Sequence, residues 1–72
     1  MARTNIQQKL GKKVRQLRKE AGLSQEKLGE LTELDRTYIS GIERGMRNPS
    51  LRNIEKLAKA LKVKVSNIIS DI

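Results

Sequence analysis

The stretch LDRTYISGIERG, residues 34–45, decides the fold, because it combines an apolar helix face with a polar one. Ile39 and Ile42 are three positions apart, which places both on the same side of a helix. The other side carries hydrogen-bond donors around a residue without a side chain: Arg36, Thr37, Ser40, Gly41 and Arg44. Asp35 is placed to cap the start of this helix, where a carboxylate also interacts favourably with the helix dipole. The stretch therefore predicts a short helix that packs with one face and presents the other.

A second short helix is predicted directly before this one, from Gln25 to about Thr32, with Ser24 as its N-cap. The apolar side chains expected to converge between the two helices are Leu28, Leu31, Leu34, Ile39 and Ile42. Residues 33–35 form the connecting turn. Two short helices joined by such a turn match the helix-turn-helix unit, here about residues 24–45, whose second helix enters the DNA major groove.

The polar face of residues 35–44 carries side chains suited to base edges. Arg36 can donate two hydrogen bonds to guanine, and Thr37 offers a hydroxyl and a methyl group for thymine. Gly41 would let the helix backbone approach DNA closely. The simpler alternative is that Arg36, Thr37 and Arg44 form only a solvated helix face. We favour DNA, because the helix-turn-helix pattern occurs in a chain with 16 Lys and Arg against 8 Asp and Glu, a formal net charge of +8.

Helical periodicity continues before this unit. A first helix is predicted from an apolar stripe that recurs every three or four positions: Ile6, Leu10, Val14, Leu17 and Ala21. Thr4 and Gln7 have the spacing of a capping box at its start, and Gly22 suits the left-handed position at its end. Gly11 indicates a close packing contact, because glycine weakens a helix interior.

A basic loop and two further helices follow the unit. Residues 46–50, MRNPS, form the loop, and Ser50 is placed to cap a fourth helix. Its apolar stripe is Leu51, Ile54, Leu57, Ala58 and Leu61. A last short helix is predicted within residues 65–72, although residues 63–65 would also fit a short extended piece. The whole chain, residues 1–72, is therefore predicted to be a single all-α domain of five helices.

The composition excludes several classes of protein. Without cysteine or histidine there is no disulfide and no Cys/His zinc site, so a partner subunit is the expected source of extra stability for a 72-residue chain. Tyr38 is the only aromatic residue, so the stacking platform of single-strand and RNA binders is missing. No carboxylate pair marks a pocket, and we expect no enzyme activity, cofactor, metal or small-molecule ligand. The N-terminus lacks an apolar signal or membrane-spanning run, which favours a cytoplasmic protein without membrane contact.

Residues 23–61 resemble a known family. The sequence LSQEKLGELTELDRTYISGIERGMRNPSLRNIEKLAKAL is similar, without insertion or deletion, to the core of the phage repressor and Cro type of helix-turn-helix protein, often called XRE. Residues 34–45 are particularly similar to controller proteins of restriction-modification systems. The resemblance implies a compact, lambda-repressor-like domain that regulates transcription by binding specific double-stranded DNA. It further implies a homodimer on a pseudo-palindromic operator, control of its own restriction-modification operon, and RNA polymerase as a further partner.

The same resemblance implies roles for individual side chains. The residues expected to recognise bases are Arg36, Thr37, Ser40 and Gly41. Those expected to contact the DNA backbone are Gln25, Tyr38, Arg44, Arg47 and Asn48. Tyr38 could equally pack against Ile42 or the first helix. Arg18 would form a structural ion pair with Glu43. Apart from the resemblance, Ile68, Ile69 and Ile72 are too many apolar side chains for one exposed last turn, so we expect them to form a dimer surface, although some must complete the core of the monomer. The alternative is that they only pack within the monomer or fray.

Two positions depart from the family pattern. Glu33 stands where the family often has Gly or Asn, so it must be strained or use a different turn. Lys64 stands where the family often has a Ser cap, which leaves the start of the last helix open. The alternative function is a protein-binding antitoxin or adaptor subunit with secondary DNA binding. An antitoxin usually needs a segment beyond the DNA-binding core, so a chain that ends at Ile72 favours the stand-alone regulator.

Overall fold

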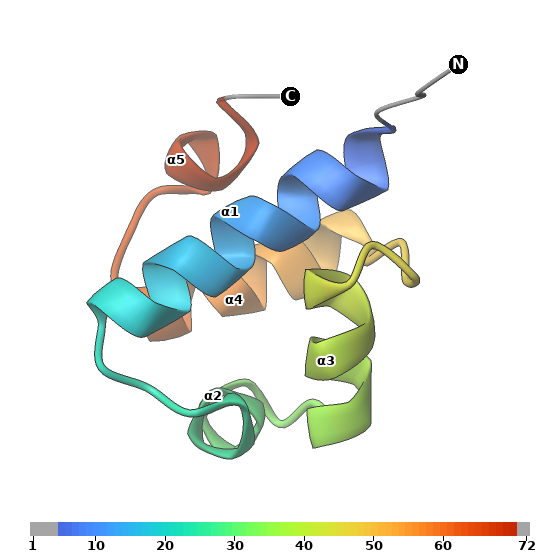
Figure 1. The fold of residues 1–72 in the computed structure, drawn as a ribbon. Coiled ribbons are helices and arrows are strands. Elements are labelled where there is room, and N and C mark those ends of the chain that lie inside the picture. Colours follow the sequence, from blue (N-terminus) through green and yellow to red (C-terminus); the bar gives the residue numbers. More distant parts are fainter. Residues whose placement is uncertain (1–4, 71–72) are drawn as a thin grey trace.

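Five α-helices account for most of residues 5–70, the part of the chain that the computed structural model describes (Figure 1). They are α1 (Ile6–Glu20), α2 (Gln25–Thr32), α3 (Arg36–Glu43), α4 (Leu51–Leu61) and α5 (Val65–Ile69). No strand occurs within these residues, and residues 63 and 64 only connect α4 to α5, so the predicted all-α, five-helix fold is confirmed. None of the five helices is both long and apolar enough to cross a membrane.

The helices enclose one core, in which α3 packs against α1 and α2. In Figure 1, α1 crosses in front of α4, α2 and α3 lie below them, and α5 packs against α1 and α4 at the opposite end. The buried apolar side chains come from all five helices: Leu10, Val14, Leu28, Ile39, Ile42, Leu57, Ala58, Leu61 and Ile68. Because Ile39 and Ile42 are fully buried, the opposite face of α3 is turned to solvent.

Four apolar residues that were expected on the inward stripes are exposed instead, and one of them is Ala21, the residue directly after α1. Leu31 is 50% exposed, because the buried side of α2 is centred on Leu28 and Thr32, four residues apart. Ile6 is 62% exposed and Leu51 is 72% exposed. Each is the first residue of its helix, where fewer neighbouring elements cover a side chain. The predicted stripes are therefore too long at these positions.

Side-chain caps begin four of the five helices. The predicted caps of α2, α3 and α4 are all present: Ser24, Asp35 and Ser50. At α1 the predicted capping box of Thr4 and Gln7 is wrong, because Asn5 is the N-cap and its Oδ1 accepts the Gln8 N–H at 2.8 Å. Thr4 itself lies outside the described residues. Lys64 is the N-cap residue of α5 and makes no capping hydrogen bond, since its side chain has no acceptor.

Four helices are followed within two residues by a left-handed backbone conformation. The residues that adopt it are Gly22, Glu33, Gly45 and Lys62. Glu33 has φ +61°, and the next residue, Leu34, donates its N–H to the Gly29 carbonyl at 3.0 Å, which closes a Schellman motif. Of the two outcomes expected for Glu33, strain or a different turn, the first holds. The turn is the one that usually contains glycine, and Glu33 adopts the positive φ that glycine tolerates best.

The end of α3 lies directly against α1 at Gly11. A Cβ atom at this position would overlap the carbonyl oxygens of Ile42 and Glu43. The predicted close contact at Gly11 is therefore confirmed, and it sets how deeply α3 sits in the fold.

Candidate nucleic-acid interface

A polar and basic surface covers α3 and the basic loop, residues 46–50. Its exposed side chains are Arg36, Thr37, Arg44, Arg47 and Asn48. Ser40 is half-buried on the same helix. Three of these residues are arginines, whose guanidinium groups stay charged and can bind phosphate or guanine in a bidentate manner. The surface therefore suits a polyanion.

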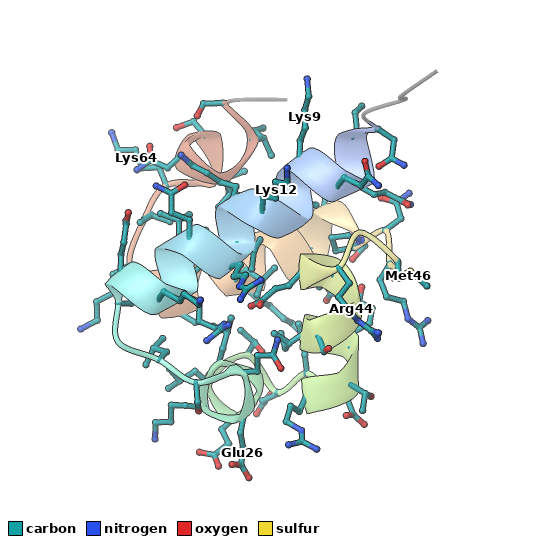
Figure 2. The ribbon with its side chains drawn as sticks, viewed as in Figure 1. Lys9, Lys12, Glu26, Arg44, Met46 and Lys64 are labelled. Atoms are coloured by element: carbon teal, nitrogen blue, oxygen red, sulfur yellow. The ribbon has the colours of Figure 1, made fainter. Side chains whose placement is uncertain are left out.

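Only part of the positive charge belongs to this surface. Figure 2 shows Arg44 at the end of α3 and Met46 in the basic loop beside it, whereas Lys9 and Lys12 extend from α1 and Lys64 lies beside α5. Positive charges away from α3, such as these three lysines, add to the long-range attraction of a polyanion.

Asp35 holds Thr37 in a fixed orientation at the start of α3. Its Oδ1 accepts both the Thr37 N–H and the Thr37 hydroxyl at 2.9 Å. These hydrogen bonds, followed by the charge of Arg36, lower the pKa of Asp35. Because the hydroxyl proton is donated to Asp35, Thr37 Oγ1 is left as an acceptor for a base amino group.

An ion pair fixes the end of α3 against α1 and the start of α2. Arg18 Nε and Nη2 donate to the two carboxylate oxygens of Glu43 at 2.6 and 3.0 Å, and Nη1 donates to the Leu23 carbonyl at 2.8 Å. The hydrogen bonds to Glu43 raise the pKa of Arg18, against the opposing effect of burial. Gln25 Nε2 donates to Glu43 at 3.1 Å. The ion pair implied by the resemblance is present, and it holds the Gln25 amide with one N–H left for a phosphate.

Tyr38 packs into the molecule from α3 and is half-buried against the core. Its hydroxyl accepts a hydrogen bond from Asn53 Nδ2 on α4 at 3.0 Å. The guanidinium carbon of Arg47 lies 5.9 Å from the centre of its ring. Sequence reasoning missed Asn53, because a contact between different helices leaves no signal in local periodicity.

Gly41 does not face the open side of α3. It is buried, and the Arg47 side chain covers it, with Cγ 2.6 Å from the place of an added Cβ. The prediction that Gly41 leaves the helix backbone open to DNA is therefore wrong for the free chain. The reason is that the basic loop folds back over α3 at this point.

The three C-terminal isoleucines have different surroundings. Ile68 was expected at a dimer surface, but it is fully buried and completes the core of the monomer. Ile69 is 41% exposed. Ile72 lies outside the described residues. Val65, four residues before Ile69 on α5, lines a shallow groove together with Leu51, Arg52 and Glu55 of α4.

The family comparison decides the class of protein. A family model described as Helix-turn-helix (HTH_3) matches residues 14–68. The chain belongs to this family. It is thus a helix-turn-helix regulator of the phage repressor and Cro type, as the resemblance of residues 23–61 implied.

Several relatives of this helix-turn-helix regulator are control proteins, and one similar solved structure is a restriction-modification controller protein. It is 53% identical over 66 residues to the control protein C.BamHI of Bacillus amyloliquefaciens, covering 90% of this chain and 82% of the relative. It is 46% identical over 69 residues to the control protein C.MunI of a Mycoplasma species, covering 94% and 93%. The crystal structure of the restriction-modification controller protein C.AhdI from Aeromonas hydrophila matches with a TM-score of 0.85 at 50% identity, covering 86% of this chain and 94% of that one. The regulator is therefore of the controller-protein type.

Proposed function

We propose that this regulator binds specific double-stranded DNA as a homodimer and controls its own restriction-modification operon. The observation that carries the proposal is the surface of α3, where Arg36 and Thr37 are exposed at the start of a helix whose other face is buried, and Asp35 orients the Thr37 hydroxyl. A helix placed in this way can enter the major groove with its first turn against base edges. The similarity to control proteins, and to a restriction-modification controller protein among the solved structures, supports the choice of operon.

The backbone contacts belong to the same proposal. Arg44, Arg47 and Asn48 lie at the end of α3 and in the basic loop, while Gln25 is held at the start of α2. These two groups lie on either side of the exposed start of α3 along the chain. We infer that they bind phosphates of the operator, with the N–H groups at the start of α2 assisting Gln25.

The proposed dimer surface is the exposed patch of α4 and α5. Leu51, Val65 and Ile69 supply its apolar part, and Arg52 and Glu55 lie beside them. In a two-fold interface the same patch is used by both subunits, so Arg52 of one copy can face Glu55 of the other. The patch is therefore self-complementary in both apolar surface and charge.

Selection of bound sequences from a pool of random DNA tests the proposal. A homodimer should enrich a pseudo-palindrome whose half-sites are one helical turn apart, about 34 Å or 10 to 10.5 base pairs. A motif without two-fold symmetry would contradict the dimer. No enrichment at all would contradict DNA recognition and favour the protein-binding adaptor.

RNA polymerase enters the proposal where the dimer activates a promoter. Transcription in vitro from a promoter that carries the selected site, with and without the protein, measures the direction of regulation. An increase supports contact with the polymerase, whereas a decrease supports simple occlusion of the promoter.

A further inference from the structure

The basic loop is fastened to the recognition helix α3 at Gly41. The Met46 N–H donates to the Gly41 carbonyl at 2.8 Å, and the Arg47 side chain lies across Gly41 itself. Farther along the loop, Pro49 is buried. The loop is therefore held at its start and near its end, with Arg47 and Asn48 exposed between these points.

Gly41 makes room for one particular side chain. It lies in the interior of α3, where glycine weakens the helix relative to alanine. Its backbone is helical, so no unusual φ requires a glycine here. A Cβ at this position would lie 2.6 Å from Arg47 Cγ, and Cγ is too near the loop backbone to move without turning the whole side chain. The missing side chain therefore permits the observed path of Arg47.

Tyr38 supports the far end of the same side chain. The Arg47 guanidinium lies 5.9 Å from the centre of the Tyr38 ring, within the range of a cation–π contact. Asn53 Nδ2 donates to the Tyr38 hydroxyl, and the Asn53 backbone N–H is itself held by the Ser50 cap at 3.1 Å. The orientation of the ring is thus tied to the first turn of α4.

We propose that Gly41 and Asn53 are positioning residues that hold Arg47 ready for a DNA phosphate. Gly41 opens the path for the aliphatic part of Arg47, and Asn53 fixes the ring that supports its guanidinium. Arg47 is then oriented in the free protein, so DNA does not have to order a long side chain on binding. This inference rests on the proposed function, because it takes Arg47 to contact DNA.

A double-mutant cycle tests the role of Gly41. Affinity for the selected operator is measured over a range of salt concentrations for the wild type, Gly41→Ala, Arg47→Ala and the double variant. Each phosphate contact contributes about 0.9 to the slope of log affinity against log salt, so Arg47→Ala should reduce the slope by about 1.8 in a dimer. Gly41→Ala should reduce it by a similar amount.

The double variant gives the decisive comparison. Once Cγ is removed by Arg47→Ala, the nearest remaining side-chain atom of residue 47 is Cβ, 3.6 Å from the added methyl group, which is an ordinary contact. Gly41→Ala should then cause no further loss of slope or affinity. If Gly41→Ala lowers the affinity equally in the wild type and in Arg47→Ala, the role of Gly41 is wrong.

The single aromatic residue supplies a measurement that needs no DNA. Tyr38 is the only aromatic side chain, so near-ultraviolet circular dichroism reports on its surroundings alone. Asn53→Ala and Gly41→Ala should both change this signal and leave the far-ultraviolet helix signal intact. Asn53→Ala should also reduce the salt slope, and it should have no added effect on a Tyr38→Phe background. Asn67→Ala, the same truncation at an exposed asparagine of α5, is the matched control.

The outcomes separate this inference from the proposed function. If Arg47→Ala leaves the salt slope unchanged while the wild type still selects an operator, the positioning role and the phosphate contact of Arg47 are both wrong, whereas specific DNA binding by the regulator stands. An unchanged Tyr38 signal in Asn53→Ala also overturns the role of Asn53. If the wild type selects no DNA, the proposed function fails first, and the role of Arg47 fails with it.

Discussion

Arg36 and Arg47 carry the same charge in different places, and this difference separates recognition from attachment. Arg36 is exposed in the first turn of α3, whereas Arg47 extends from the basic loop over Tyr38. Arg36→Ala should cost about 1 to 3 kcal/mol on the preferred operator and relax preference at one base pair per half-site. Arg47→Ala should weaken binding to every sequence alike. Competition with operator and random DNA measures both, and equal losses on the two DNAs for Arg36→Ala would rule out base recognition by Arg36.

Asp35 makes the start of α3 sensitive to acid. Thr37 and then Arg36 lower its pKa in the folded protein. The carboxylate therefore stabilises the fold above the ordinary aspartate pKa of about 3.9, and this contribution is lost as the pH falls through the lower pKa of the folded state. Asp35→Ala should be less stable than the wild type at neutral pH, and the difference should disappear in acid. Urea unfolding at several pH values measures it, with Asp35→Asn as a cap that does not titrate. A difference that persists unchanged into acid would contradict this linkage.

The predictability of single residues follows from how far away their partners lie. Ser24 and Asp35 could be identified as caps, because each hydrogen bond joins residues two or three positions apart. Leu31 and Gly41 could not be placed correctly from periodicity. The burial of Leu31 on α2 and of Gly41 on α3 depends on segments that are distant in the sequence. Arg47, for example, folds back over Gly41.

At the level of elements, the end of α2 stores conformational strain that one substitution should relieve. Glu33 is exposed and has φ +61°, a conformation that costs a residue with a Cβ about 1 kcal/mol. Glu33→Gly should therefore stabilise the protein by up to about 1 kcal/mol, after the greater freedom of glycine in the unfolded chain is counted. Chemical denaturation measures this change. Glu30→Gly, inside the same helix, is the matched control and should destabilise by about 1 kcal/mol. The same sign for both variants would contradict the interpretation.

The helices themselves could be predicted well, but the contacts between them could not. The three- and four-residue spacing of apolar side chains follows directly from the helix period, so α1 to α4 lie where the sequence places them. The ion pair of Arg18 and Glu43 was expected only through the family resemblance. The hydrogen bond from Asn53 to Tyr38 was not expected at all, because it depends on where the start of α4 lies relative to α3.

For the whole molecule, α5 joins the stability of the monomer to the proposed assembly. Ile68 fills the core between α1 and α4, whereas Ile69, the next residue, is turned partly to solvent. A five-residue helix without a side-chain cap has little stability of its own, so its position depends on Ile68. The dimer patch is therefore presented only when the core beneath it is formed.

A charge should consequently have different effects at the two neighbouring isoleucines: at Ile68 it should disrupt folding, and at Ile69 it should disrupt only the dimer. Ile68→Glu should unfold the chain, because a carboxylate would be buried without a partner. Ile69→Glu should leave a folded, helical monomer that binds a half-site weakly and loses tight operator binding, since the charge would lie in a two-fold interface close to its own copy. Sedimentation and far-ultraviolet circular dichroism distinguish these outcomes. The proposed dimer surface is wrong if Ile69→Glu still sediments as a dimer, and the dimer itself is wrong if the wild type sediments as a monomer at high micromolar concentration.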